Sequence, residues 1–134
     1  MHYVVNKFLF QKLSIKLGFS IPLNVFGPGL SIAHYGTIVV NSAAKVGKNC
    51  RIQEGVNIGS TNGSSGAPKI GDNVFIGTGS KIIGDIFIED DVAIGANAVV
   101  VKSIIEKGVT YGGVPAKKIS SNDSRSNLSP KLFE

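Results

Sequence analysis

The sequence of 134 residues contains no Trp, one Cys and two His, and aromatic residues make up only 7% of it. A hydrophobic core must therefore be built from aliphatic side chains rather than from large rings. Charged residues are also scarce, at 17%, whereas Gly occurs 17 times. Each Gly weakens a helix interior by up to about 1 kcal/mol, which argues against an ordinary helical bundle. The composition favours a single domain with many tight corners.

Further absences limit the cellular setting and the partners. Because Cys50 is the only cysteine, no internal disulfide can form, and a reducing, cytoplasmic location is expected. No apolar run approaches the roughly 20 residues that cross a bilayer, and no secretory cleavage pattern is visible. The net charge of +5 comes without a nucleic-acid-binding motif, so no nucleic-acid partner is expected.

The sequence does contain a six-residue repeat of aliphatic side chains. Ile or Val occupies nine of ten successive positions spaced six apart, and Gly often follows directly. The nine positions are Val46, Ile52, Ile58, Ile70, Ile76, Ile82, Ile88, Ile94 and Val100. A period of six fits neither one long helix nor a plain alternating strand. It predicts a parallel β-helix, in which three hexads, each a short strand and a corner, complete a triangular coil.

Two irregularities interrupt the repeat. The Gly/Ser-rich segment 60–69 is too polar for a core, so it is expected to project from a corner as an active-site or intersubunit loop. Upstream, the pairs Ile32/Ile38 and Val40/Val46 differ by a shift of two residues. The coil that contains them therefore holds about two extra residues, and His34 lies in it.

The repeat divides the chain into three parts. Residues 20–119 form the predicted β-helix. Residues 1–19 mix apolar and Lys-containing patches, and they are predicted to form an amphipathic helix that covers the open end of the solenoid. Weak contact of this segment with a membrane surface is the alternative. Residues 120–134 are polar and free of the repeat, which is typical of a flexible tail.

Several segments together resemble the left-handed β-helix acyltransferases with hexapeptide repeats. They are GLSIAHYGTIVVNSAAKVG, the loop ending in APKIGDNVFIGTGSKIIGDI, then VAIGANAVV and YGGVPAKKI. The similarity covers roughly residues 20–119 and is greatest to the serine-acetyltransferase-like branch. It implies an all-β fold with a left-handed coil and a short N-terminal helical segment. It also implies a homotrimer that binds acetyl-CoA in clefts between neighbouring solenoids.

The resemblance implies roles for individual residues. His34 would be the general base that takes the proton of an acceptor hydroxyl as it attacks the thioester, since imidazole ordinarily changes charge near neutral pH. The positions that match the cofactor motifs are Gly77, Thr78, Gly79, Ala96, Gly113 and Lys117. Small residues there would let the pantetheine arm lie against backbone amides. Lys117 and Lys118 would offset phosphate charge, and no metal is expected.

Departures from the serine-acetyltransferase pattern bear on the acceptor. The Asp that this family places upstream of its catalytic His is absent, since the region reads Phe19-Ser20-Ile21. Gly66-Ala67 stands where the family has Arg-His. A sugar hydroxyl of surface-polysaccharide synthesis is therefore predicted as the acceptor, with the small molecule L-serine as the alternative. A non-catalytic scaffold is a second alternative, whereas a γ-carbonic-anhydrase-like centre would need three His ligands.

The hexad spacing adds a residue that the resemblance does not supply. Because the coil of His34 holds two extra residues, its stacked neighbour one coil later is predicted to be Glu54, about 5 Å away. We expect Glu54 to replace the missing Asp, orienting the imidazole and stabilising its charged form. Asp72 and Asp90 are expected to continue the same column. An ordinary solvated acidic stripe is therefore the alternative interpretation.

Overall fold

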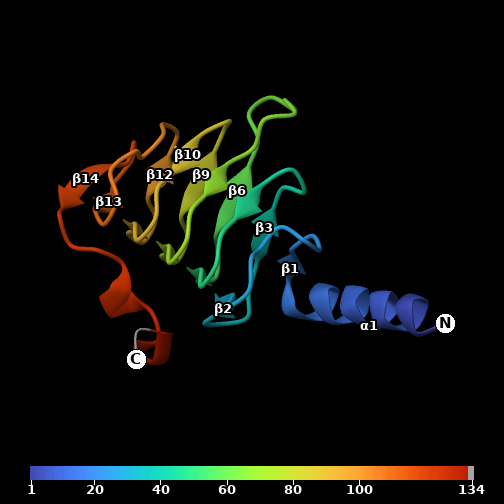
Figure 1. Cartoon of the computed structure of the whole chain (residues 1–134). Helices are drawn as coiled ribbons and strands as arrows, with labels where there is room; N and C mark the ends of the chain where they lie inside the picture. Colours follow the sequence, from blue (N-terminus) through green and yellow to red (C-terminus); the bar gives the residue numbers. More distant parts are fainter. Residues whose placement is uncertain (133–134) are drawn as a thin grey trace.

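The structure is a computed structural model that describes residues 1–132, and it consists of one helix followed by short strands. Figure 1 shows the strands stacked along one axis, with α1 (His2–Leu17) at the N-terminal end of the stack. The strands are β1 (Phe19–Ser20), β2 (Ser31–Ile32), β3 (Ile38–Val40), β4 (Lys45–Val46), β5 (Arg51–Ile52), β6 (Asn57–Gly59), β7 (Lys69–Ile70), β8 (Phe75–Ile76), β9 (Lys81–Ile83), β10 (Phe87–Ile88), β11 (Ala93–Ile94), β12 (Val99–Val100), β13 (Thr110–Gly112) and β14 (Lys117–Ser120).

Three sheets form the three faces of a triangular prism. Their strand orders are β1-β3-β6-β9-β12, β4-β7-β10 and β2-β5-β8-β11-β13-β14. Strands that follow one another through the coils belong to different sheets, and every pair is parallel except β13 with β14. Each coil therefore satisfies the backbone groups of the next one. The predicted left-handed parallel β-helix is confirmed.

The pairing register gives the length of each coil. Ile76 pairs with Ile94, 18 residues later, which is the regular coil of three hexads. Ile32 pairs with Ile52, 20 residues later, but Val40 pairs with Ile58 at the regular 18. The two extra residues predicted near His34 thus lie between β2 and β3.

The Gly/Ser-rich loop lengthens another coil. Ile52 pairs with Ile76, 24 residues later, so this coil holds one hexad more than a regular coil. The loop projects from the corner between β6 and β7, as predicted, and is visible in green in Figure 1. This corner separates the first sheet from the second, whereas His34 lies at the corner between the third sheet and the first. Within one chain, the loop and His34 therefore occupy different corners.

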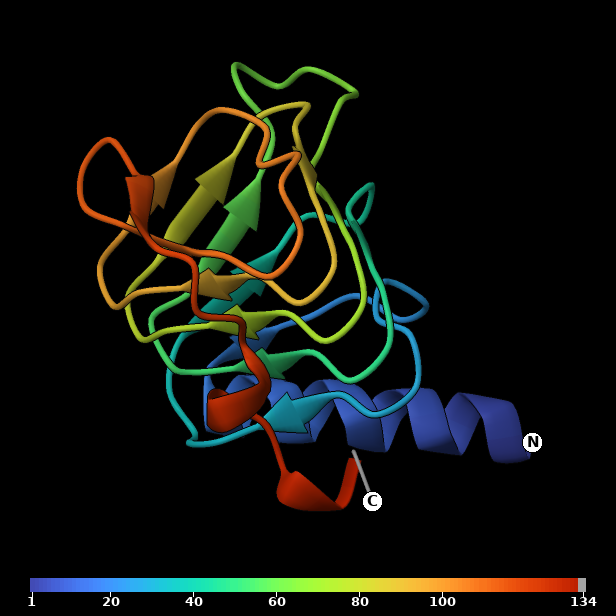
Figure 2. The ribbon, with the colours of Figure 1, turned by 60° about the vertical axis from the view of Figure 1, so that its left-hand side comes forward.

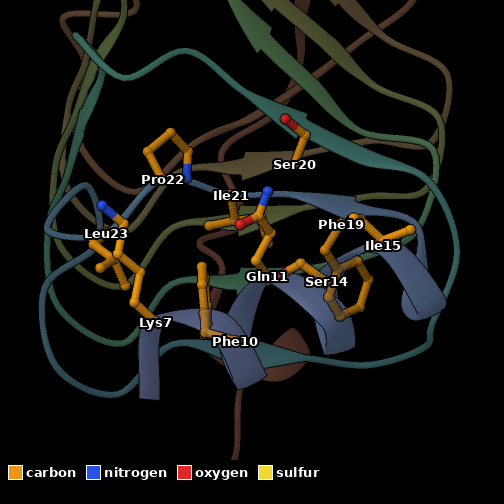
Figure 3. A pocket seen from close by; sticks show the side chains of 10 residues that line it. All are labelled: Lys7, Phe10, Gln11, Ser14, Ile15, Phe19, Ser20, Ile21, Pro22 and Leu23. Carbon is orange, nitrogen blue, oxygen red and sulfur yellow. The ribbon is translucent and has the colours of Figure 1, made fainter. Parts of the chain in front are cut away.

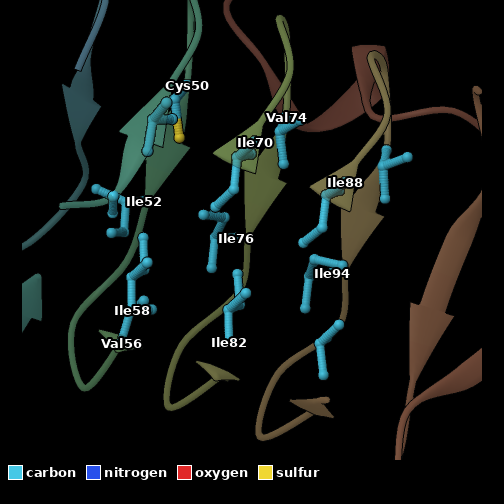
Figure 4. Close-up of a cluster of buried hydrophobic side chains, with 14 of the residues drawn as sticks. Cys50, Ile52, Val56, Ile58, Ile70, Val74, Ile76, Ile82, Ile88 and Ile94 are labelled. Carbon is cyan, nitrogen blue, oxygen red and sulfur yellow. The ribbon is translucent and has the colours of Figure 1, made fainter. Parts of the chain in front are cut away.

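The repeated aliphatic side chains fill the interior of the prism. Ile52, Ile58, Ile76 and Ile82 are fully buried and point inward in rows, as Figure 4 shows. Each contributes about 1.5–3 kcal/mol relative to an exposed side chain. Cys50 occupies a small interior position, and burial raises the pKa of its thiol to about 12. It is therefore a packing residue and not a nucleophile.

One corner of the prism, which we call the ladder corner (residues 47–49, 71–73 and 89–91), is held by polar side chains. Asn49, Asn73 and Asp91 all have left-handed backbone, with φ between 56° and 58°. The Asn49 amide donates to Asn73 at 2.9 Å, and the Asn73 amide donates to Asp91 at 2.8 Å. Lys107 forms an ion pair with Asp91 at 3.3 Å. The ladder ties successive coils together.

The predicted N-terminal helix is confirmed, but it is not amphipathic. Figure 2 shows α1 lying across the end of the solenoid, with its N-terminal half projecting beyond the coils. None of its residues is buried, and apolar side chains occupy most of its circumference rather than one face. Gly18 ends the helix with left-handed backbone at φ 78°. No helix in the described part of the chain is long and apolar enough to cross a membrane.

The segment after β14 packs on the solenoid instead of forming the predicted flexible tail. Ser124 is fully buried; its N–H donates to the Asp91 carbonyl at 3.0 Å, and its hydroxyl donates to the Asn73 carbonyl. Leu128 is also buried, at 4% exposure. Two short 3-10 turns, Arg125–Asn127 and Pro130–Leu132, complete the segment. Residues 133–134 of the predicted tail lie outside the described residues.

Candidate active site

His34 lies just after β2, in the irregular part of its coil. The N–H of Ala33 donates to the Ile52 carbonyl at 3.2 Å. The backbone therefore stays hydrogen-bonded to the next coil as far as Ala33. The two extra residues then turn the backbone outward, with Gly36 at φ 143°. The His34 side chain is exposed, and within residues 1–132 it forms no hydrogen bond. The imidazole is therefore free to meet a substrate.

Glu54 lies beside the His34 segment, one coil further along. A Cβ placed on Gly36 would lie 3.0 Å from the Glu54 Cβ, and the N–H of Gly55 donates to the Thr37 carbonyl at 2.7 Å. The residue directly beside Glu54 is thus Gly36, two positions after His34, and the pairing of Glu54 with His34 itself stays a prediction. The structure contains no hydrogen bond between the Glu54 carboxylate and the His34 imidazole in residues 1–132.

Thr78 continues this column in the following coil. Its hydroxyl lies 2.5 Å from Glu54 Oε1 and 3.0 Å from the Glu54 carbonyl oxygen. The pKa of the Glu54 carboxyl is lowered, first by this Thr78 hydrogen bond, then by a backbone hydrogen bond within Glu54, and also by the charge of His34. Partial desolvation opposes the shift. The side chain of Thr78 thus holds the Glu54 carboxylate, and its predicted contact with a cofactor stays a prediction.

The acidic stripe predicted through Asp72 and Asp90 does not exist. Both residues lie at the ladder corner, where Asp72 accepts from the Lys48 N–H and Asp90 accepts from the Asp72 N–H, each at 2.7 Å. The coil after Glu54 holds 24 residues because of the loop, so counting 18 residues from Glu54 leads to the wrong corner. Glu54 is therefore not part of a row of equivalent acids.

The predicted cofactor residues do share one edge of the solenoid. Gly77, Thr78 and Gly79 follow β8, Ala96 follows β11, and Gly113 follows β13. Together with residues 33–37 and 53–55, this edge forms what we call the open corner (residues 33–37, 53–55, 77–79, 95–97 and 112–113). From His34 to Gly113 it spans four coil steps, or about 19 Å.

Glycine is required at two of these positions for packing. A Cβ on Gly77 would lie 2.8 Å from the Ala96 nitrogen, so the adjacent coil could not approach. Gly79 has left-handed backbone at φ 71°, and a Cβ there would collide with the Asn97 side chain. The two glycines thus shape the open corner whether or not a ligand is bound.

Three of the predicted cofactor residues already use their backbone amides within the solenoid. The N–H groups of Gly77, Thr78 and Gly79 already donate to Ile94 O, Gln53 Oε1 and Glu54 O, at 2.9, 3.0 and 2.9 Å. The N–H of Ala96, in contrast, has no partner among the described residues, and the residue is exposed. Ala96 is therefore a position where an amide remains available.

Two contacts at the open corner were missed from the sequence. The Gln53 side chain occupies the Thr78 amide, and Lys81 Nζ donates to the carbonyls of Gly55 and Gly79 at 2.6 and 2.7 Å. Neither residue interrupts the hexad pattern, because both occupy outward positions next to a buried Ile. Only the pairing of β5 with β8 and of β6 with β9 brings them to this corner.

Lys117 and Lys118 lie on β14, at the far end of the same edge. Gly112 on β13 pairs with Lys117. Lys118 forms an ion pair with Glu106 at 2.7 Å, whereas the exposed Lys117 has no ion pair within residues 1–132. Of the two, Lys117 is therefore the cation available to an anionic ligand.

The open corner is not an enclosed cavity. A cavity of about 490 Å³ lies elsewhere, between α1 and residues 19–23, and its lining includes Lys7, Phe10 and Gln11 (Figure 3). None of the predicted site residues lines it. No cluster of metal-ligating side chains is present in the part of the chain that the structure describes.

Comparisons with known proteins define the class. The family described as bacterial transferase hexapeptide (six repeats) matches residues 67–102. A serine acetyltransferase of Helicobacter pylori strain J99 is 36% identical over 123 residues, covering 90% of this chain and 71% of that protein. Together with the fold, these matches define a hexapeptide-repeat transferase. The chain belongs to the serine acetyltransferase family.

Solved structures agree with this assignment. The Brucella abortus serine acetyltransferase in complex with coenzyme A has a TM-score of 0.68 and 42% identity, over 72% of this chain and 39% of that one. The Neisseria gonorrhoeae enzyme in complex with serine has a TM-score of 0.64 and 40% identity, over 69% and 38%. The chain is shorter than many relatives, spanning for example 66% of the Staphylococcus epidermidis protein.

The predicted sugar acceptor is wrong. Relatives that match 90% or more of the chain at 35–36% identity are serine acetyltransferases and not polysaccharide-modifying enzymes. The prediction rested on two missing groups, at residues 19–21 and 66–67. L-serine can be held by side chains other than the ones missing at these positions. Two positions were therefore too little evidence for rejecting it as the acceptor.

Proposed function

We propose that this protein transfers the acetyl group of acetyl-CoA to the hydroxyl of L-serine. Its membership in the serine acetyltransferase family over 90% of its length supports this proposal most directly. The relatives solved with coenzyme A and with serine support the two substrates. The open corner provides an exposed imidazole followed by a strip of small residues, which suits an extended thioester substrate.

His34 is the general base of this reaction. Its imidazole accepts the proton of the serine hydroxyl while that oxygen forms a bond to the thioester carbonyl carbon. The carbon–sulfur bond then breaks, and the proton passes to the departing thiolate of coenzyme A. The transfer is direct, so no nucleophilic Ser or Cys is required, in agreement with the buried Cys50.

The remainder of the open corner holds acetyl-CoA. The free N–H of Ala96 donates to the pantetheine arm, and the exposed Lys117 lies where it can offset phosphate charge. The span of about 19 Å from His34 to Gly113 lets an extended ligand place its thioester near the imidazole. Thr78 contributes little through its amide, because Gln53 already occupies that group.

The active unit is a homotrimer. A single chain leaves the open corner uncovered, and its Gly/Ser-rich loop projects from a different corner. The loop can therefore reach an active site only in a neighbouring copy. Light scattering during size-exclusion chromatography should give about 42 kDa, three times the 14.0 kDa of one chain. A mass of one chain would contradict this part of the proposal.

The function is tested by measuring the release of coenzyme A from acetyl-CoA. Wild-type protein should release it with L-serine and not with a panel of sugars and nucleotide sugars. His34→Ala should lower kcat about 10²- to 10⁴-fold, the usual contribution of a general base. His2→Ala is the matched control and should retain full activity. Equal turnover by His34→Ala would refute the assigned base, and release with a sugar alone would refute the acceptor.

A further inference from the structure

Glu54 is held in one orientation by the coil that follows it. Thr78 donates its hydroxyl proton to Oε1 at 2.5 Å, and the Thr78 backbone is itself fixed by Gln53 Oε1 at 3.0 Å. Charge-assisted hydrogen bonds of this length are stronger than neutral ones. One oxygen of the carboxylate is thus satisfied, and its position determines where the second oxygen lies.

The second oxygen, Oε2, is buried and has no hydrogen-bond partner among the described residues. A buried acceptor without a hydrogen bond is unfavourable, and more so when it is charged, so such atoms usually have a partner. Gly36 and Thr37 pack directly on Glu54 and Gly55: a Cβ on Gly36 would lie 3.0 Å from the Glu54 Cβ, and the N–H of Gly55 donates to the Thr37 carbonyl at 2.7 Å. Oε2 therefore lacks a donor beside the segment that carries the exposed His34 side chain.

Other charged groups near this corner are less suitable partners. Lys81 on β9 already donates to the Gly55 and Gly79 carbonyls. Arg51 on β5 also has a buried Nε without a partner in residues 1–132, but its charge is not among the causes of the lowered pKa of Glu54. Lys16, in the last turn of α1, belongs to the preceding layer of the stack. Of these groups, His34 has an exposed side chain without a hydrogen bond in residues 1–132, and its charge lowers the pKa of Glu54.

We propose that Glu54, held by Thr78, is a positioning residue that accepts a hydrogen bond from the His34 imidazole and fixes it for proton transfer. This inference rests on the proposed acetyl transfer. A carboxylate on one ring nitrogen selects the tautomer that leaves the other nitrogen free to accept a proton. It also stabilises the imidazolium that forms when the serine hydroxyl is deprotonated. Thr78 acts indirectly, through the carboxylate.

Glu54→Gln tests the pairing because it keeps the shape of the side chain and removes its charge. We expect kcat to fall about 10- to 100-fold, as for other residues that orient a catalytic group, while KM for both substrates changes little. The acid limb of the pH–rate profile should move to lower pH, because the imidazolium has lost its counter-charge. Glu89→Gln, at the ladder corner, is the matched control and should leave rate and profile unchanged.

Thr78 provides an independent variant. Thr78→Val removes the hydroxyl, and it should lower kcat in the same direction as Glu54→Gln but by less. Thr78→Ser restores the hydroxyl and should recover most of the rate. A purely structural role would not produce this recovery together with a shifted pH profile. Light scattering and circular dichroism are the controls that check whether each variant keeps the wild-type assembly and fold.

An NMR titration of the His34 ring separates this inference from the proposed function, because it needs no turnover. The midpoint should be lower in Glu54→Gln than in wild type, and unchanged in Glu89→Gln. If wild type showed no transferase activity but the midpoint still moved, the pairing would stand and the function would fail. An unmoved midpoint would overturn the pairing. So would a Glu54→Gln enzyme that raised only KM for L-serine, since Glu54 would then bind the acceptor.

Discussion

Two corners of the same solenoid differ in how completely their polar groups are used. At the ladder corner, Asn73 both donates and accepts across coils, and Ser124 donates to its carbonyl oxygen. At the open corner, and counting partners in residues 1–132 only, the His34 side chain has no hydrogen bond, Glu54 has a buried oxygen without one, and the Ala96 amide is free. The repeat gives both corners the same spacing. What distinguishes a functional corner from a structural one is the set of groups left unsatisfied.

The largest effect is expected from a change that removes support for both corners. Ile76 is fully buried on β8, the strand that joins Asn73 at the ladder corner to Thr78 at the open corner. Ile76→Ala should lower the free energy of unfolding by about 2–5 kcal/mol, because it leaves a cavity in the prism. Urea unfolding measures this loss. Ile105→Ala, at a position 81% exposed, should change it by less than about 0.5 kcal/mol. Equal values for the two variants would contradict the stacked core.

A comparison of two asparagines sharpens the contrast between the corners. Asn73 and Asn97 both have left-handed backbone, with φ of 56° and 57°, but only Asn73 belongs to the hydrogen-bonded ladder. Asn97→Ala should lower the free energy of unfolding by about 1–2 kcal/mol, because Ala adopts left-handed backbone less readily than Asn. Asn73→Ala should cost about 1–3 kcal/mol more, since it also leaves Asn49 and Asp91 without their partner. If the two variants were equally stable, the ladder would contribute nothing.

High pH should weaken the fold through the thiol of Cys50. This residue comes directly after Asn49 of the ladder corner in the sequence. Its pKa in the folded protein is about 12, against an ordinary value of 9.0. As pH rises above about 9, the unfolded thiol loses its proton and the buried one does not, so stability should fall progressively towards pH 12. Cys50→Ala should remove this part of the pH dependence, as urea unfolding at several pH values would reveal. Rapid reaction of native protein with a thiol reagent at pH 8 would contradict the burial.

The smallest effect is expected from Glu54 at low pH. Because its folded pKa is lowered below the ordinary value of 4.5, chiefly by the Thr78 hydrogen bond, its ionised form stabilises the fold above that value. This contribution should be lost as pH falls through the folded pKa. Glu54→Gln should therefore show a slightly shallower loss of stability below pH 4.5 than wild type. An identical acid dependence of the two proteins would show that the carboxylate is not held.

The regular part of the fold could be predicted from the sequence because the hexad places one buried aliphatic on each face. The same spacing located the two extra residues beside His34. It brought Glu54 to the same segment, although the residue directly against Glu54 is Gly36. It failed beyond the loop, because an insertion of six residues preserves the period while moving every later hexad to another face. Asp72 was therefore assigned to the wrong corner, and Thr78 was not recognised as the partner of Glu54.

Features that depend on contacts rather than on period were also missed. Gln53 and Lys81 occupy ordinary outward positions, and only strand pairing shows what they bind. In α1 the mixture of apolar residues and lysines suggested two faces, but the apolar side chains are spread around the helix. The polar composition after Ser120 suggested a free tail, although Ser124 and Leu128 are buried against the solenoid. Composition indicates average exposure and does not reveal a single anchoring residue.

The central claim is that the open corner, and not the ladder corner or the cavity beside α1, binds acetyl-CoA. Amide chemical shifts of the wild-type protein, recorded as acetyl-CoA is added, test it most directly. Saturable shifts are expected at Ala96, at Gly113 and around His34, with Asn49 and Asn73 unmoved. Shifts confined to the ladder corner, or to residues 7–23 around the cavity, would contradict it.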